Sequence, residues 1–495
     1  MIKMISRRLF FQSLFATAAI PAFANPPSTS LRPRARAADH YKKAVSAADR
    51  LIADAKLGGR VAFAVADVKT GLVLEENDAN IGLPPASVAK AVTALYALKA
   101  LGANHRFETT LVADGTISGG ILTGDLILVG GGDPTLDTDR LAAMAADLKA
   151  AGIKEVRGRF MVYGGALPKS DEIDSDQPDH VGYNPAVSGL NLNYNRVHFQ
   201  WVRAGQGYTV TMDARSERYR PDVRVARMSI VNRAAPVYTY KKAPDRDQWT
   251  VAKSALGKSG SRWLPVRKPE MYAGEVFQTF AGSHGITLRA PVLAVRRPKG
   301  TVLVRHKSVQ LRTILKDMLK YSTNLTAEVV GMAATQKLYG QVSGIAASAR
   351  AMSQWAAKDL GMTGAKFVDH SGLGDRTRIT VAALVKGMVS ARKDGISNIL
   401  KNIPLRDAKG RPIKQHPIKV RAKTGTLNFV SGLAGYMVAK DGTELAFAIV
   451  AADLPRRDRL KPEQKERPDG GGAWNKRAKK LQQKLIERWG ALYGA

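Results

Sequence analysis

The chain has 495 residues and a formal charge of +34, from 76 Lys and Arg against 42 Asp and Glu. Its length exceeds what one hydrophobic core supports, so we expect two or three domains of a globular protein. The absence of cysteine excludes disulfides, thiolate nucleophiles and cysteine-ligated metals. The eight histidines include no pair at a zinc-ligand spacing, so we expect neither a metal nor a cofactor.

Residues 1–24 are typical of an export signal. Lys3 and the pair Arg7-Arg8 precede an apolar run, which ends in a small-x-small cleavage site at residues 22–24. The segment SRRLFF around the pair resembles a twin-arginine signal, which exports a folded protein, and an ordinary secretory signal is the alternative. No later stretch reaches the ~18 apolar residues of a membrane span. We therefore expect a periplasmic protein without a transmembrane span once the signal is removed.

The net positive charge predicts a polyanionic partner. Nucleic acid is disfavoured, because we expect export, the aromatic content is only 7%, and the chain carries no RNA-recognition, zinc-finger or single-strand stacking motif. An anionic cell wall or membrane face is the better partner. A solvated basic surface without a specific role is the alternative.

The predicted elements divide the chain into two parts of one domain and an insert. Residues 25–38 are rich in Pro and Arg and predict a linker. Residues 39–104 predict a helix, a hairpin and a second helix, and residues 304–455 predict helices followed by strands. Residues 105–303 carry short strands and glycine turns. We expect one α/β domain that is interrupted by this β-rich insert.

Residues 456–495 predict a basic loop followed by a helix. This tail holds 12 Lys or Arg against 5 Asp or Glu. The first candidates for contact with an anionic wall are the loop cations Arg456, Arg457, Arg459 and Lys461. The helix has an apolar stripe, which favours packing on a sheet over a position on a membrane surface. The stripe consists of Trp474, Ala478, Leu481, Leu485, Trp489 and Leu492.

Three short motifs follow one another along the two parts of the predicted domain. They are Ser87-Val-Ala-Lys90 at a helix start, Ser322-Thr-Asn324 between two helices, and Lys423-Thr-Gly on a strand. Each alone is weak, because Ser-x-x-Lys is expected by chance about once or twice in such a chain and Ser87 would also serve as a helix cap. Together, in this order, they are the signature of penicillin-binding proteins and serine β-lactamases.

The residue types of the first two motifs suit acyl transfer to a serine. Lys90, one helical turn after Ser87, lies on the same helix face and can take the hydroxyl proton if its amine is neutral. Burial and the cation Lys423 would both lower the pKa of Lys90. Ser322 can relay the proton to the leaving amine, and Asn324 can orient Lys90 and bind the substrate amide.

The third motif suits substrate binding. Lys423 would bind a substrate carboxylate with the hydroxyls of Thr424 and Thr426. Gly425 would leave room for an acyl chain along the strand edge. The backbone N–H groups of Ser87 and Thr426 would stabilise the developing oxyanion.

The sequence resembles the class C low-molecular-mass penicillin-binding proteins, the D-alanyl-D-alanine carboxypeptidase/endopeptidase family, over most of residues 40–455. Beyond the three motifs, similar segments are GDLILVGGGDPTL at 124–136, PAVSGLNLNYN at 185–195 and DHSGLGDRTRIT at 369–380. The resemblance implies an α/β (α+β) domain of the serine β-lactamase/transpeptidase type. Such a domain has an antiparallel sheet flanked by helices, and the large β-rich insertion is a trait of the family.

The sequence departs from the family in places that bear on substrate binding. Where the family has D-G-S-G-L-S-R, Asp375 stands at the arginine position and Arg376 follows, so Arg376 is the candidate substrate-binding residue. The resemblance also implies that an aspartate of the insert meets the ammonium group of the substrate. Asp176 and Asp179 are both candidates.

We expect an exported serine DD-peptidase that cleaves D-Ala-D-Ala termini or D-Ala-containing cross-links of peptidoglycan stem peptides through an acyl-serine intermediate, with β-lactam antibiotics as acylating inhibitors. A serine β-lactamase is an alternative, although the chain lacks a Glu-x-x-x-Asn or Tyr-x-Asn motif where a deacylating base is needed. A non-catalytic cell-wall-binding module on the same fold is the third interpretation. The preference between carboxypeptidase and endopeptidase activity and the oligomeric state stay open.

Overall fold

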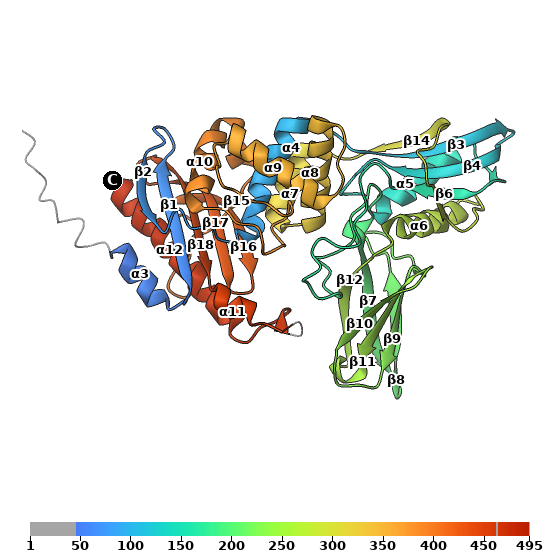
Figure 1. Cartoon of the computed structure of the whole chain (residues 1–495). Helices are drawn as coiled ribbons and strands as arrows, with labels where there is room; N and C mark the ends of the chain where they lie inside the picture. Colours follow the sequence, from blue (N-terminus) through green and yellow to red (C-terminus); the bar gives the residue numbers. More distant parts are fainter. Residues whose placement is uncertain (1–45, 462–463, 495) are drawn as a thin grey trace, which may run out of the picture. The chain divides into compact units, whose positions relative to one another are not determined.

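The computed structural model describes residues 46–461 and 464–494 (Figure 1). The predicted signal at 1–24 and linker at 25–38 lie outside the described residues. None of the helices in the described ranges is long and apolar enough to span a membrane.

An antiparallel sheet joins the two ends of the described chain. Its strand order is β15-β16-β17-β18-β1-β2. Strand β1, early in the chain, pairs with β18, near its end, with Phe63 opposite Ile449. The strands are β1 (Arg60–Asp67), β2 (Val73–Asn77), β15 (Lys401–Asn402), β16 (Lys419–Leu427), β17 (Val430–Val438) and β18 (Glu444–Ala452). This pairing closes a domain whose chain is interrupted between its first helices and its later ones.

Helices cover both faces of this sheet, as Figure 1 shows. One side holds a helical layer, in which α4 is buried on all sides from Ala89 to Ala97 because it packs between the sheet and the other helices. These helices are α4 (Ala89–Leu101), α7 (Leu311–Tyr321), α8 (Asn324–Tyr339), α9 (Ile345–Asp359) and α10 (Val381–Ala391). The other side holds α3 (Ala48–Ala55) and α12 (Gly471–Tyr493), and the short α11 (Leu454–Asp458) follows the end of β18.

The apolar stripe of α12 belongs to the core. Trp474 and Trp489 are fully buried, and the stripe packs with Phe63, Phe447 and their neighbours on the sheet. The prediction that this helix packs on a sheet is confirmed, and its position excludes the membrane-surface alternative.

The insert between α4 and α7 is rich in strands, as expected. A mixed sheet of order β13-β6-β4-β3-β14 packs against α5 and α6, and two smaller sheets have the orders β12-β7-β8 and β10-β11-β9. Strand β14 ends at Lys307, beyond the predicted boundary at 303. The bounds are β3 (Glu108–Ser118), β4 (Ile121–Gly130), α5 (Thr138–Ala150), β5 (Glu155–Val156), β6 (Phe160–Tyr163), β7 (Arg196–Ala204), β8 (Gly207–Asp213), β9 (Ala226–Val231), β10 (Tyr238–Lys242), β11 (Asp247–Ala252), β12 (Ser259–Pro265), α6 (Pro269–Ser283), β13 (Val292–Leu293) and β14 (Thr301–Lys307).

Candidate active site

Ser87 lies at the start of α4 and borders a cavity of about 860 Å³. A short 3-10 turn, Ala86–Val88, leads into α4, and Ala86 has the left-handed φ of 49°. The cavity is also lined by Ser322, Asn324 and Thr426. The fold therefore brings residues of the first two sequence motifs, and Thr426 directly after the third, to one cavity.

Lys90 is fully buried next to Ser87 and contacts three oxygen atoms. Its Nζ lies 3.0 Å from Ser87 Oγ, 2.7 Å from Asn324 Oδ1 and 2.7 Å from the carbonyl oxygen of Ser371. The amide of Asn324 has its nitrogen on the other side, where it donates to the carbonyl oxygen of Tyr183 at 2.9 Å. Asn324 and the insert thus fix the orientation of Lys90.

The three oxygen contacts fit an ammonium that donates to all three oxygen atoms and also fit a neutral amine. Asn324 Oδ1 and the Ser371 carbonyl can only accept hydrogen bonds, so they take the two N–H groups of a neutral Lys90. The lone pair then faces the hydroxyl of Ser87. Burial lowers the pKa of Lys90, and the nearby carboxyl groups of Asp369 and Glu328 oppose this shift.

Ser322 and Lys423 form a second hydrogen-bonded pair. Ser322 sits between α7 and α8 with a left-handed φ of 59°, and its Oγ lies 3.0 Å from Lys423 Nζ. Lys423 is buried and also donates to the carbonyl oxygen of Thr424 at 2.7 Å. Burial, and next the charge of Lys90, lowers the pKa of Lys423 well below its usual value. This pair can pass a proton at the cavity side of β16.

The structure gives a different reason for a glycine at position 425 from the one we predicted. A Cβ at this position would lie 2.4 Å from the carbonyl oxygen of Pro85 and 3.1 Å from the backbone nitrogen of Ser87. The missing side chain therefore lets β16 approach the backbone at Ser87, rather than leaving room for an acyl chain. Thr426 borders the cavity, whereas Thr424, an exposed and described residue, is not among its lining residues.

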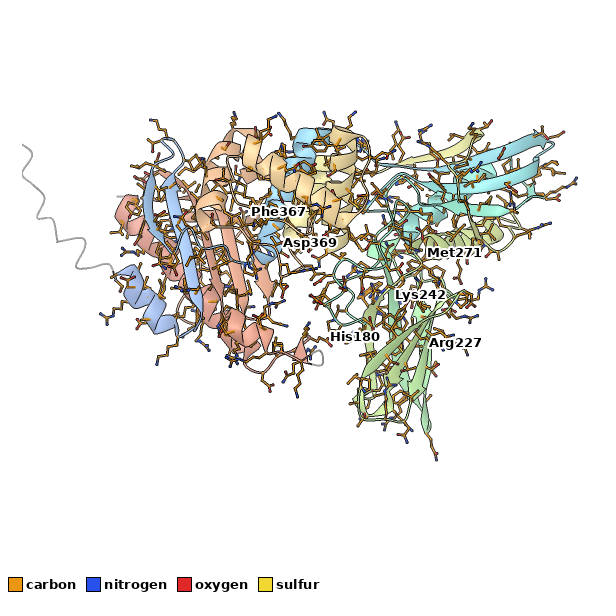
Figure 2. All side chains as sticks on the ribbon, viewed as in Figure 1. His180, Arg227, Lys242, Met271, Phe367 and Asp369 are labelled. Atoms are coloured by element: carbon orange, nitrogen blue, oxygen red, sulfur yellow. The ribbon has the colours of Figure 1, made fainter. Side chains whose placement is uncertain are left out.

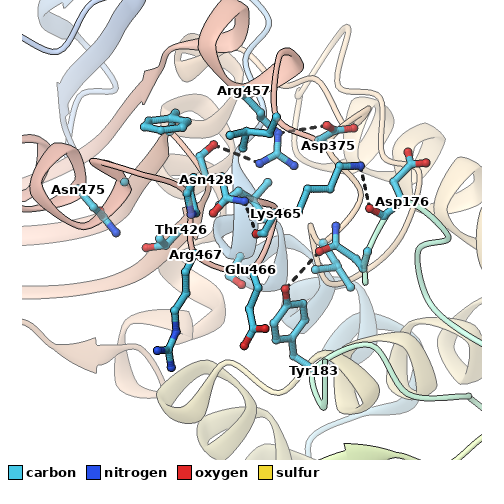
Figure 3. Close-up of a pocket in the computed structure, with 18 of the residues that line it drawn as sticks. Asp176, Tyr183, Asp375, Thr426, Asn428, Arg457, Lys465, Glu466, Arg467 and Asn475 are labelled. Atoms are coloured by element: carbon cyan, nitrogen blue, oxygen red, sulfur yellow. Dashed lines mark hydrogen bonds and ion pairs between the residues drawn. The ribbon is translucent and has the colours of Figure 1, made fainter. Parts of the chain in front are cut away.

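The structure separates Arg376 from Ser87. Arg376 is exposed and borders another cavity of about 760 Å³, with Lys169 and Arg350, and among the described residues it does not line the Ser87 cavity. Asp375 faces the Ser87 cavity instead and pairs with Arg457, whose Nε lies 3.1 Å from Asp375 Oδ2 (Figure 3). One step along the loop is enough to turn the side chain away from the cavity.

Of the two aspartates of the insert, Asp176 borders the Ser87 cavity. Its carbonyl oxygen accepts a hydrogen bond from Lys465 Nζ at 2.9 Å, and Figure 3 shows the two residues side by side. Asp179 is described but does not line this cavity, and its carbonyl oxygen accepts from Arg267. The geometry favours Asp176 over Asp179.

Two sets of residues near Ser87 were not predicted from the sequence as part of the site. Arg457 lies in α11, and Lys465 and Glu466 follow that helix; the only signal in this segment was its basic character. Glu328 and Asp369 are buried carboxyl groups behind Lys90. Glu328 follows Asn324 by four residues on α8, and this one-turn spacing was the available signal.

Comparison with known proteins identifies the family of the chain. Residues 44–473 match the model of the D-Ala-D-Ala carboxypeptidase 3 (S13) family. The chain belongs to this family. The resemblance inferred from the motifs is therefore confirmed.

Relatives of the chain are similar over most of their length. A D-alanyl-D-alanine carboxypeptidase of Actinomadura sp. (strain R39) is 29% identical over 443 residues, which cover 81% of this chain and 79% of the relative. A D-alanyl-D-alanine carboxypeptidase of Haemophilus influenzae is 24% identical, with 79% and 85% covered. The solved structure of penicillin-binding protein 4 from H. influenzae superposes with a TM-score of 0.72 at 19% identity, covering 89% of this chain and 100% of that one. It shares the fold, which confirms the predicted fold class.

Proposed function

We propose that the protein is a serine DD-peptidase in which Ser87 is the nucleophile and Lys90 the general base. The observation that carries this proposal is the position of Lys90 Nζ, 3.0 Å from Ser87 Oγ. In the neutral form its lone pair is directed at that oxygen, because Asn324 Oδ1 and the Ser371 carbonyl take its two N–H groups. Membership of the D-Ala-D-Ala carboxypeptidase family and the names of the relatives support the substrate, a peptidoglycan stem peptide that ends in or is cross-linked through D-Ala.

Acylation follows from the contacts around the cavity. Ser87 Oγ attacks the carbonyl carbon on the acyl side of the scissile bond while Lys90 takes the hydroxyl proton. The backbone N–H groups of Ser87 and Thr426 stabilise the oxyanion. When the C–N bond breaks, the leaving amine takes a proton from Ser322, and Lys423 returns one to Ser322 across 3.0 Å. An acyl-serine and a free amine result.

Deacylation follows the same chemical steps, with water as the nucleophile. Between the two half-reactions Lys90 gives up the proton from Ser87, and Lys423 regains one through the solvent of the cavity, so both lysines return to their starting charge. Lys90 then takes a proton from the water as it attacks the acyl carbon, and passes it to Ser87 Oγ as the acyl–oxygen bond breaks. Lys423 and Thr426 bind the substrate carboxylate, and Asp176 meets the ammonium group of its side chain. The length of the leaving peptide decides between carboxypeptidase and endopeptidase activity.

The family membership supports an enzyme that acts outside the cytoplasm. The predicted signal at residues 1–24 supports export to the periplasm by the twin-arginine route. β-Lactams fit as acylating inhibitors, since a structure of H. influenzae penicillin-binding protein 4, a protein with this fold, is described as a β-lactam complex. A β-lactamase would be acylated at the same serine but would release the adduct quickly.

Mass spectrometry of the purified protein after exposure to benzylpenicillin tests the proposal. We expect one adduct, on the peptide that contains Ser87, and none in Ser87→Ala. An adduct that persists for many minutes supports the DD-peptidase, and one that is lost within seconds supports the β-lactamase. A folded protein that forms no adduct would favour the non-catalytic wall-binding module.

A further inference from the structure

One peptide group connects Lys90 to a buried carboxyl group. The carbonyl oxygen of Ser371 accepts from Lys90 Nζ at 2.7 Å. The N–H of the same peptide group, that of Gly372, donates to Asp369 Oδ1 at 2.6 Å. Asp369 and Lys90 therefore bind opposite ends of the Ser371–Gly372 peptide group.

Two carboxyl groups fix the backbone around this peptide. The second oxygen of Asp369 accepts from Gly374 N at 2.6 Å. Glu328 on α8 accepts from His370 N at 3.0 Å and from Ser371 N at 2.8 Å, one with each oxygen. Glu328 is 0% and Asp369 2% exposed, so water does not compete for these hydrogen bonds. Figure 2 marks Asp369 in the helical part of the domain.

Apolar packing and neutral hydrogen bonds hold the same loop independently of its carboxyl groups. Gly372 has a φ of 71°, and a Cβ there would lie 1.9 Å from the carbonyl oxygen of Ala86. The ring of His370 fills the space beside Gly331, and its Nε2 lies 2.7 Å from Ser348 Oγ. Burial lowers the pKa of His370 to about 3, so the ring is neutral. The position of the loop thus has support besides Asp369 and Glu328.

We propose that Asp369 is a positioning residue that acts on Lys90 through the Ser371–Gly372 peptide group, and that Glu328 completes this arrangement. The inference rests on the proposed roles of Ser87 and Lys90. An amide whose N–H donates to a carboxylate has a more negative carbonyl oxygen, because neighbouring hydrogen bonds polarise one another. That oxygen binds a Lys90 N–H more tightly and keeps the lone pair of the amine directed at Ser87.

The same carboxyl groups affect the charge of Lys90. The groups that face Lys90 are Ser87 and Asn324, the Ser371 carbonyl, the cation Lys423, and the carboxyl groups of Asp369 and Glu328. Asp369 and Glu328 raise the pKa of Lys90 against the stronger effect of burial, while burial raises their own pKa values. Removing one carboxylate charge should therefore lower the pKa of Lys90 further.

The test is the pH dependence of acylation by a fluorescent penicillin, measured as the second-order rate constant. In Asp369→Asn the rate above the acid limb should fall roughly tenfold to a hundredfold, as for loss of a hydrogen bond to a charged group. The midpoint of the acid limb should move to lower pH by about one unit. Glu328→Gln should shift the limb in the same direction by less. Asp369→Glu keeps the negative charge but changes the position of the carboxylate. Its acylation should be slow, and the midpoint of its acid limb should stay near that of the unmodified protein.

Asp441→Asn is the matched control. Asp441 accepts from Thr443 N in the exposed hairpin between β17 and β18, so this variant makes the same change in a similar turn away from Lys90. Its pH profile should equal that of the unmodified protein.

Three results would overturn the inference. They are an unmoved acid limb in folded Asp369→Asn and Glu328→Gln, an equal shift in Asp441→Asn, or failure of both neutral variants to fold, since the carboxylates would then serve the structure. Absence of a Ser87 adduct in the unmodified protein would instead contradict the proposed function itself.

Discussion

Two groups of charged residues near Ser87 differ in their exposure and in the direction in which their surroundings shift their pKa values. The buried cluster of Lys90, Glu328, Asp369 and Lys423 is at most 2% exposed, and burial shifts each pKa toward the neutral form. The rim, Asp176, Asp375, Arg457, Lys465 and Glu466, keeps contact with solvent. There, a hydrogen bond with His180, assisted by Arg262, lowers the pKa of Glu466 to about 2. The buried cluster suits proton transfer, and the rim suits fixed charges.

The largest expected effect is in the buried region. Ser87→Ala should abolish labelling by fluorescent penicillin, because Ser87 carries the only hydroxyl among the described residues that contact Lys90 Nζ. The melting temperature should change little, since the side chain is half-buried and its hydrogen bond is with Lys90. Ser322→Ala, which leaves the nucleophile in place, should still label slowly. Labelling of Ser87→Ala at the original rate would show that Ser87 is not the nucleophile.

Lys90→Arg should lower acylation about a thousandfold, the usual contribution of a general base, because a guanidinium does not deprotonate. In the unmodified protein the rate should rise with pH, since the neutral amine is the reactive form. Its midpoint should lie below the ordinary lysine value of 10.5, because burial lowers the pKa of Lys90. Stopped-flow acylation across pH measures both.

Lys99→Arg is the control for this substitution, because Lys99 is exposed in the last turn of the same helix. Its rate and pH profile should not change. Full activity of Lys90→Arg would mean that another group takes the proton of Ser87.

Gly372→Ala tests how tightly the buried region is packed. The new Cβ would approach the carbonyl oxygen of Ala86, next to Ser87, so the backbone at the nucleophile must move. We expect lower stability and slower acylation. Gly364→Ala provides the control, because Gly364 has a similar φ of 77° and no atom within 4 Å of its Cβ position. Gly364→Ala should lose about 1–2 kcal/mol of stability, the cost of a left-handed backbone for alanine, and its acylation rate should not change. Equal effects in the two variants would show that packing against Ala86 is unimportant.

The difference between the regions also explains what the sequence could predict. Ser87, Lys90 and Asn324 have fixed spacings on helices, so short motifs identify them, and the antiparallel sheet and β-rich insert follow from the family those motifs indicate. The rim joins Asp176 of the insert to Lys465 of the tail by a backbone contact, which no spacing encodes. Arg376 was assigned by its place next to a family position. The structure turns it away, and Arg457 from a distant segment faces the cavity instead.

At the rim we expect smaller effects. Glu466 contacts His180 Nε2 and Arg262 Nη2 of the insert, each at 2.8 Å. Glu466→Gln should lower the melting temperature modestly at pH 7 and raise KM for a small D-Ala-D-Ala peptide a few-fold, with kcat nearly unchanged. Because the folded pKa of Glu466 lies below its ordinary value of 4.5, its contribution is complete above that value and is lost as pH falls toward 2.

Thermal unfolding from pH 7 to pH 3 measures this loss, and the difference between Glu466→Gln and the unmodified protein should shrink with falling pH. Glu155→Gln is the control, since it breaks an exposed pair with Arg157, which contributes little. A constant difference at all pH values would show that Glu466 acts by packing rather than by charge.

Salt should have the smallest effect on catalysis and should separate the exposed cations from the buried cluster most clearly. If exposed cations recruit the enzyme to an anionic wall, binding to isolated sacculi should weaken steeply with salt, because surface charges are screened within about 8 Å at physiological ionic strength. Turnover of a small soluble peptide should change much less, since Lys423 is 1% exposed.

The loop cations are unequal in this test. Arg457 borders the cavity, and Arg456 donates to the carbonyl oxygen of Asp469 and lies over the ring of Phe429, so neither is a clean surface charge. Arg459→Gln with Lys461→Gln, both at exposed positions, should reduce the salt dependence of sacculus binding and leave the small peptide unaffected. Arg457→Gln should impair the small peptide as well, because it leaves Asp375 unpaired at the rim. Salt-independent binding to sacculi, or equal losses on both substrates in the double variant, would leave the positive charge as a solvated surface without a role in recruitment.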